Sequence, residues 1–134
     1  MPKESTNKNN VLLVEDEMYI REMIEEFLRN DGFEVFSCKS ALEAYKCFEQ
    51  HNIDLLVTDV LLSNESGIDI ALRLTQKKKS LLVLIVSGYI SEFEDEIHPE
   101  WYFLQKPFQA KQFLNLVHNL ISRKPNNYEE KDIK

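Results

Sequence analysis

The hydrophobic residues of this chain follow two alternating periods. Short apolar runs, typical of buried strands, occupy residues 11–14, 33–36, 53–58, 81–86 and 101–104. Between these runs, apolar residues recur every three or four positions, as on one face of a helix, within residues 20–28, 41–48, 68–72 and 113–120. Strands that alternate with helices predict an α/β fold, in which helices cover both faces of a parallel sheet.

The polar residues between these segments predict where helices begin and end. Ser40 is expected to cap the helix that follows it, and Gly67 is expected to open the next one. The sequence Asn30-Asp31-Gly32 is expected to stop the first helix. Residues 91–97 carry only a weak pattern, so the element between the last two strands is the least defined.

Length and composition favour one soluble domain. The chain has 134 residues, of which 43% are hydrophobic and 29% charged. We expect a disordered N-terminal tail over residues 1–10, one domain over 11–121 and a flexible C-terminal tail over 122–134. No apolar segment resembles a signal peptide or a membrane span, so the expected location is the cytoplasm, away from membranes.

Net charge and cysteine content disfavour a nucleic-acid-binding protein and a cysteine-based metal or redox protein. The net charge is −7, which disfavours nucleic acid as a partner, and Lys77, Lys78 and Lys79 are expected only to end a helix in water. Cys38 and Cys47 lack the spacing of a metal or redox motif and are expected to be reduced thiols.

Four of the predicted strands end in polar or charged residues. Glu15 and Asp16 follow the first strand, Asp59 the third, Ser87 the fourth and Lys106 the fifth. The carboxyl ends of parallel strands lie at one edge of a sheet, where such folds bind ligands. Clustered carboxylates need a cation, and hard oxygen ligands suit Mg²⁺, with a phosphate as further ligand. An Asp beside Mg²⁺ and a lysine can act as a nucleophile toward a phosphoryl group.

The motifs VLLVEDE, TDVLLSNESG, VSGY and LQKPF occur in this order. From residue 11 to about 121, the chain resembles the receiver domain of bacterial two-component response regulators. The motifs SGY and LQKPF are similar to those of receivers attached to hybrid histidine kinases. The resemblance implies a flavodoxin-like, doubly wound (βα)5 fold, a three-layer sandwich with a five-stranded parallel sheet of order 2-1-3-4-5. It also implies a signalling phosphoacceptor, which catalyses only its own phosphorylation and dephosphorylation.

The resemblance assigns the acidic residues. Asp59 would accept a phosphoryl group from a phosphohistidine, on a sensor histidine kinase or a histidine phosphotransfer protein. Asp16 would bind Mg²⁺ directly, with Mn²⁺ as an alternative ion, and Glu15 would act mostly through water. Asp59 itself and the backbone carbonyl of Leu61 would complete the metal ligands. Glu17 is expected only to cap a helix.

The remaining motif residues would bind the phosphoryl group and signal its presence to an unidentified downstream protein. Lys106 would contact the acyl phosphate and Ser87 would hydrogen-bond it. Phe103 occupies the position of the switch aromatic and would turn inward as Ser87 moves, although an aromatic in an apolar strand is also typical of the core. The Lys106–Pro107 peptide bond is expected to be cis.

The sequence departs from the family pattern in four ways. Ser63 stands where proline is usual, which predicts a looser loop over residues 62–66. Leu61 and Tyr89 flank the phosphoryl site and are expected to screen it from water. The interval from Ser87 to Lys106 is short, which predicts a short or irregular helix there. No output domain follows residue 121, so the chain is expected to be a stand-alone receiver.

Three other functions fit the sequence less well. A haloacid-dehalogenase-like phosphatase needs a second Asp two residues after its nucleophile, where this chain has Leu61. A degenerate receiver that only binds a partner would not need the full set of acidic residues, Ser87 and Lys106. Nucleotide binding is disfavoured because the three glycines, Gly32, Gly67 and Gly88, form no phosphate-binding loop.

Overall fold

A single parallel sheet with helices on both faces makes up the structure, a computed structural model that describes residues 9–88 and 99–122. The five strands are β1 (Asn10–Val14), β2 (Glu34–Cys38), β3 (Leu55–Thr58), β4 (Leu82–Ser87) and β5 (Tyr102–Gln105). Their order is β2-β1-β3-β4-β5 and every neighbouring pair is parallel. This confirms the predicted fold class and strand order.

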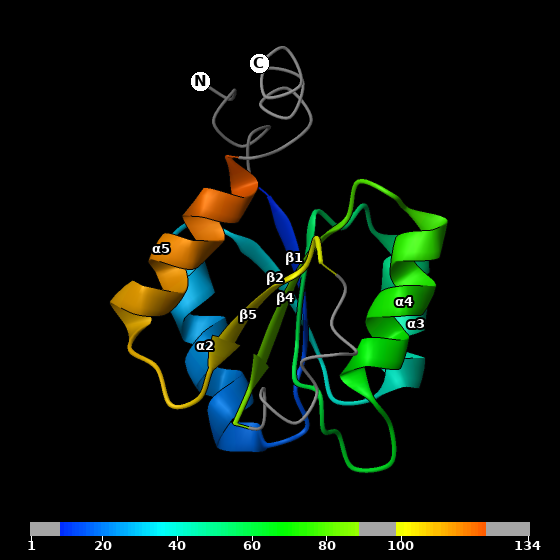
Figure 1. Cartoon of the computed structure of the whole chain (residues 1–134), viewed down its shortest axis with the longest axis horizontal. Helices are drawn as coiled ribbons and strands as arrows, with labels where there is room; N and C mark the ends of the chain where they lie inside the picture. The colour runs from blue at the N-terminus through cyan, green and yellow to red at the C-terminus, as the bar shows by residue number, and fades with distance from the viewer. Residues whose placement is uncertain (1–8, 89–98, 123–134) are drawn as a thin grey trace.

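The helices lie in two layers, one on each side of the sheet (Figure 1). Helices α2 (Met18–Asn30) and α5 (Ala110–Ile121) cover one face, and α3 (Ala41–Gln50) and α4 (Gly67–Lys77) cover the other. The weakly patterned segment between the last two strands lies outside the described residues, as does most of both predicted tails. The tail boundaries shift slightly, because Asn10 is the first residue of β1 and Ser122 is the C-cap of α5.

Both faces of the sheet are buried, which explains the unbroken apolar runs. In β1, Leu12 lies in the core under α3 and α4, whereas its neighbour Leu13 lies in the core under α2 and α5. Phe113 of α5 is fully buried in the second core. The core therefore fixes which residues of each strand face which helix layer.

Four strands begin one or two residues later than the apolar pattern predicts. Phe33, Ile53, Leu81 and Trp101 are buried but precede the hydrogen-bonded ladder of their strands. An apolar side chain reports burial, whereas strand assignment requires backbone pairing, so the two boundaries need not agree.

The predicted helix ends are confirmed. The side chain of Ser40 accepts a hydrogen bond from the backbone N–H of Glu43 at 3.2 Å, and Glu17 accepts one from Ile20 at 3.3 Å. Helix α2 stops at Asp31, and Gly32 follows with a φ of +95°, a conformation that glycine adopts without strain.

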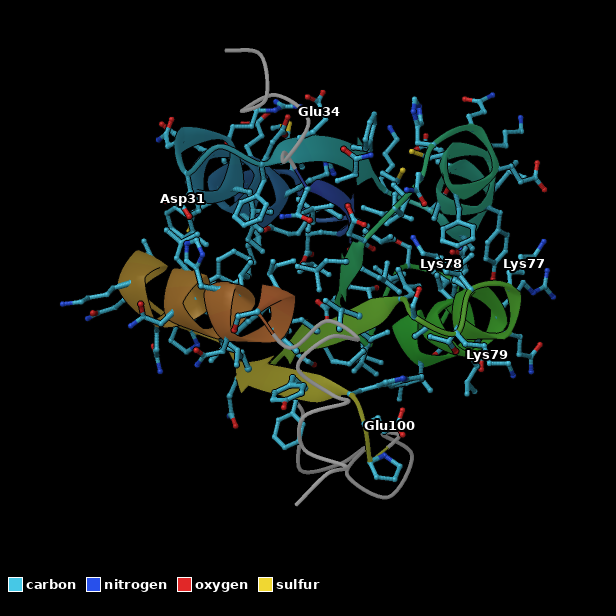
Figure 2. The ribbon with its side chains drawn as sticks, turned by 90° about the horizontal axis from the view of Figure 1, so that it is seen from above. Asp31, Glu34, Lys77, Lys78, Lys79 and Glu100 are labelled. Atoms are coloured by element: carbon cyan, nitrogen blue, oxygen red, sulfur yellow. The ribbon has the colours of Figure 1, made fainter. Side chains whose placement is uncertain are left out.

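The basic run marks the end of α4. Lys77 lies in its last turn and Lys78 is its C-cap, with the Lys78 ammonium donating to Asn52 and to the carbonyl of Ile53. Figure 2 shows the three labelled lysines together at this end of α4. Within the described residues, no helix is long and apolar enough to cross a bilayer.

Candidate functional site

The sheet brings the polar strand ends together at one edge. Strands β4 and β5 point toward the same end of the molecule, the lower end in Figure 1. The backbone N–H of Asp59 donates to the carbonyl of Val14 at 3.3 Å, and that of Lys106 donates to the carbonyl of Ser87 at 2.9 Å. These bonds extend the strand pairing past the ends of the ladders, so the residues that follow adjacent strands stay side by side.

Lys106 joins two carboxylates from different strands. Its Nζ lies 2.7 Å from Oδ2 of Asp59 and 3.0 Å from Oε1 of Glu15. Glu15 is 1% exposed and Asp59 is 9% exposed, so these contacts are shielded from solvent. Charge-assisted hydrogen bonds of this length are strong when water is excluded, so Lys106 fixes both carboxylates in place.

Burial and charge shift the pKa of both partners. Burial raises the pKa of Glu15, which the hydrogen bond and charge of Lys106 only partly oppose. Burial would lower the pKa of Lys106, but its contacts with Asp59 and Glu15 outweigh this effect and raise it. Lys106 therefore keeps its positive charge beside Asp59.

The three consecutive acidic residues after β1 have three different environments. Glu15 points into the site and contacts Lys106, and its second oxygen accepts a hydrogen bond from the backbone N–H of Glu17 at 3.2 Å. Asp16 is turned toward the next loop, where its Oδ2 accepts a hydrogen bond from the hydroxyl of Ser63 at 2.6 Å. Glu17 caps α2, as predicted. Like charges are thus separated although the residues are adjacent in sequence.

Helix α4 begins in direct contact with the backbone of Asp59. A Cβ atom on Gly67 would lie 1.7 Å from the carbonyl oxygen of Asp59 and 2.7 Å from Oγ1 of Thr58. The backbone N–H of Gly67 donates to the carbonyl of Val60 at 2.8 Å. Only glycine allows this approach, and it positions the loop that leaves Asp59.

The loop over residues 61–66 is held by several hydrogen bonds, where the missing proline had suggested a looser segment. The backbone N–H of Leu62 donates to the carbonyl of Glu65 at 3.1 Å, and the carboxylate of Glu65 accepts from the N–H of Ala41 at 2.6 Å. Ser63 adds the contact with Asp16. The serine that stands where proline is usual supplies the hydroxyl of this last contact.

The other predicted site residues differ in burial. Ser87 is fully buried at the end of β4, and the Lys106–Pro107 peptide bond is cis. Phe103 lies on the edge strand and is 46% exposed, so it is not part of the core. Leu61 is exposed in the loop after Asp59. Tyr89 lies outside the described residues.

One residue near the site was not indicated by the sequence motifs. The side chain of Arg21 donates a hydrogen bond to the backbone carbonyl of Glu15 at 3.0 Å.

A doubly wound α/β domain with buried carboxylates and a lysine at its strand ends defines a class of small regulatory domain. The family model for the response regulator receiver domain matches residues 11–118, and the chain belongs to this family. Receiver domains are signalling domains rather than conventional enzymes.

Individual relatives agree with this assignment. The chain is 27% identical over 118 residues to the probable transcriptional regulator ycf29 of Pyropia yezoensis, covering 84% of this chain and 53% of that protein. A response regulator receiver domain protein from Clostridium thermocellum has 26% identity and a TM-score of 0.78, with 86% of this chain and 95% of that chain covered. The Thermotoga maritima response regulator TrrA, solved in complex with Mg²⁺-BeF, has 27% identity and a TM-score of 0.76, with 84% and 98% covered. The chain spans about half the length of the curated relatives it matches.

Proposed function

We propose that Asp59 accepts a phosphoryl group from a phosphohistidine, on a sensor histidine kinase or a histidine phosphotransfer protein. The observation that carries the proposal is the 2.7 Å contact between Oδ2 of Asp59 and the Lys106 ammonium, at the edge where the strands end. The ammonium lies against the carboxylate that would act as the nucleophile, so its positive charge would draw an anionic phosphoryl group to Asp59.

The residues around Asp59 suit this transfer. An oxygen of Asp59 forms the bond to phosphorus as the bond from phosphorus to the donor's imidazole nitrogen breaks. Lys106 compensates the negative charge of the phosphoryl oxygens, and the hydroxyl of Ser87 donates to one of them. Phe103 is the residue that reports the change, because its exposed side chain turns inward as Ser87 moves. The modification shifts an equilibrium between two conformations rather than creating a new fold.

The donor set fits a divalent cation. Glu15, Asp16 and Asp59 carry three negative charges when ionised, and Lys106 supplies one positive charge, which leaves a charge of −2. Carboxylates and the carbonyl of Leu61 are hard oxygen ligands of the kind that Mg²⁺ prefers. Bound Mg²⁺ would neutralise charge on the transferring phosphoryl group, with Mn²⁺ as an alternative ion. Within residues 9–88 and 99–122, no three acidic, His or Cys side chains already converge as a metal site. Asp16 would therefore have to move toward Glu15 and Asp59 to take part.

Binding of beryllofluoride with Mg²⁺ tests the proposal. We expect saturable shifts of the Ser87 and Lys106 amide resonances in ¹⁵N NMR spectra, because this phosphoryl analogue would bind between Asp59 and Lys106. The shifts should require Mg²⁺ and should disappear in Asp59→Asn. Asp69→Asn, which removes an exposed carboxylate from the first turn of α4, is the matched control and should respond like wild type. A response that survives in Asp59→Asn would contradict the proposal.

Leu61 is proposed to slow the loss of the phosphoryl group. Its apolar side chain follows Asp59 by two residues and is 47% exposed, and in this proposal it hinders an attacking water. We expect Leu61→Asn combined with Tyr89→Glu to accelerate phosphate release by roughly tenfold, a difference of about 1.4 kcal/mol in activation free energy. Release is measured as free phosphate after phosphodonor removal, with Leu72→Asn on α4 as the control. An unchanged rate in the double variant would refute this role.

A further inference from the structure

The loop between Asp59 and α4 is closed on itself and tied to a neighbouring helix. Leu61 and Ser66 form an isolated antiparallel bridge, and Leu62 and Glu65 are hydrogen-bonded across the loop. Glu65 also accepts a hydrogen bond from the first backbone N–H of α3, at Ala41. These contacts fix the base of the loop and leave its tip, at residues 63 and 64, beside the acidic site.

The tip of this loop engages the one site carboxylate that Lys106 does not contact. The hydroxyl of Ser63 donates to Oδ2 of Asp16 at 2.6 Å, a contact between residues 47 positions apart. Lys106 contacts Glu15 and Asp59, and no cationic side chain among the described residues pairs with Asp16. The Oδ2 atom of Asp16 therefore lies at the tip of the loop.

We propose that Ser63 is a positioning residue that holds Asp16 in the metal-free state and competes with a divalent cation for this carboxylate. This inference rests on the proposed function. To bind the cation together with Glu15 and Asp59, Asp16 would have to move toward them, and in this proposal that movement breaks its hydrogen bond with Ser63. Because hydrogen bonds to ionised groups are stronger than neutral ones, the exchange reduces the net affinity for the cation.

The competition also couples the loop to the site. If Ser63 weakens cation binding, then the bound cation must weaken the contact between Ser63 and Asp16 by the same factor, because coupling free energies are reciprocal. Glu65 remains tied to Ala41 throughout, so the change is confined to the tip. Leu61, at the base of the same loop, is held by its bridge to Ser66.

Metal titrations of four proteins test the inference. The dissociation constant of Mg²⁺ is measured from ¹⁵N NMR shifts in the wild type, Ser63→Ala, Ser63→Thr and Asn64→Ala. We expect Ser63→Ala to bind Mg²⁺ about three- to tenfold more tightly, the effect of one partly exposed, charge-assisted hydrogen bond. Ser63→Thr keeps the hydroxyl and should restore the wild-type constant. Asn64→Ala changes the neighbouring tip residue and should also leave the constant unchanged.

The metal-free spectra give a second readout. Without Mg²⁺, Ser63→Ala should shift the amide resonance of Asp16, whereas Ser63→Thr should shift it far less. If the wild type binds Mg²⁺ and Ser63→Ala binds it equally or more weakly, the proposed role of Ser63 is wrong but the proposed function still stands. Absence of Mg²⁺ binding in all four proteins would overturn the proposed function and this inference together.

Discussion

A Gly67→Ala variant is expected to lose about 3 kcal/mol of folding stability, a large effect for the addition of one methyl group. The added Cβ would lie 1.7 Å from the carbonyl oxygen of Asp59, far inside van der Waals contact. The obstructing atom belongs to the backbone, so no side-chain rotation can relieve the clash. Helix α4 would have to move away from β3, which would disturb the loop that leaves Asp59.

Urea denaturation followed by circular dichroism measures this loss. Gly88→Ala is the matched control, because a Cβ at Gly88 meets no atom of residues 9–88 and 99–122 within 4 Å and its φ is not in the left-handed region. The control should change the free energy of unfolding by less than about 0.5 kcal/mol. Equal stability of the two variants would show that α4 does not start against the backbone of Asp59.

A Lys106→Met variant is expected to lose about 3 kcal/mol in the absence of divalent cations. The substitution keeps most of the aliphatic side chain but leaves Glu15 and Asp59 buried without the ammonium that joins them. Removing one partner of a buried ion pair is more costly than replacing both, because a desolvated charge remains. Lys77→Met, at an exposed position in the last turn of α4, is the control and should have little effect.

The loss in Lys106→Met should depend on pH in a defined direction. Burial already raises the pKa of Glu15 above its ordinary value of 4.5, and removing Lys106 removes the interactions that oppose the rise. The folded variant then binds a proton more tightly than the unfolded chain does, so its stability falls as pH rises through the raised pKa. The stability difference from wild type should therefore shrink as the pH is lowered from about 8 toward 5. Urea denaturation with EDTA at several pH values measures it, and a difference that grows toward low pH would contradict this electrostatic account.

The sequence predicted the sheet and the residues at its edge because both depend on local patterns. Apolar runs report strands that are buried on both faces, and a parallel sheet places the residues after those strands together. Asp59 and Lys106 are 47 residues apart in sequence, yet they follow strands β3 and β5, which run parallel on either side of β4 and end at the same edge. The strand limits were less accurate, since Ile53 and Trp101 are buried without belonging to a ladder.

Contacts within loops could not be predicted in the same way. The hydrogen bonds from Ser63 to Asp16 and from Ala41 to Glu65 join side chains or backbone groups that no periodic pattern relates. The direction in which Asp16 points also depends on its side-chain rotamer. The sequence does not indicate whether that rotamer places the carboxylate near a loop hydroxyl or near the other carboxylates. For Phe103, the apolar strand pattern could not distinguish the core from the exposed side of an edge strand, because Tyr102, Phe103 and Leu104 are all apolar or aromatic.

Chemical mapping of the acceptor residue tests the central claim most directly. The protein is incubated with Mg²⁺ and acetyl phosphate, reduced with borohydride to convert an acyl phosphate into an alcohol, digested and analysed by mass spectrometry. In the wild type, the account predicts one Mg²⁺-dependent modification, in which homoserine replaces Asp59. In Lys106→Met, at most a trace of this modification is expected. Modification of Glu15 or Asp16 instead, or unmodified Asp59 in folded protein saturated with Mg²⁺, would contradict the account.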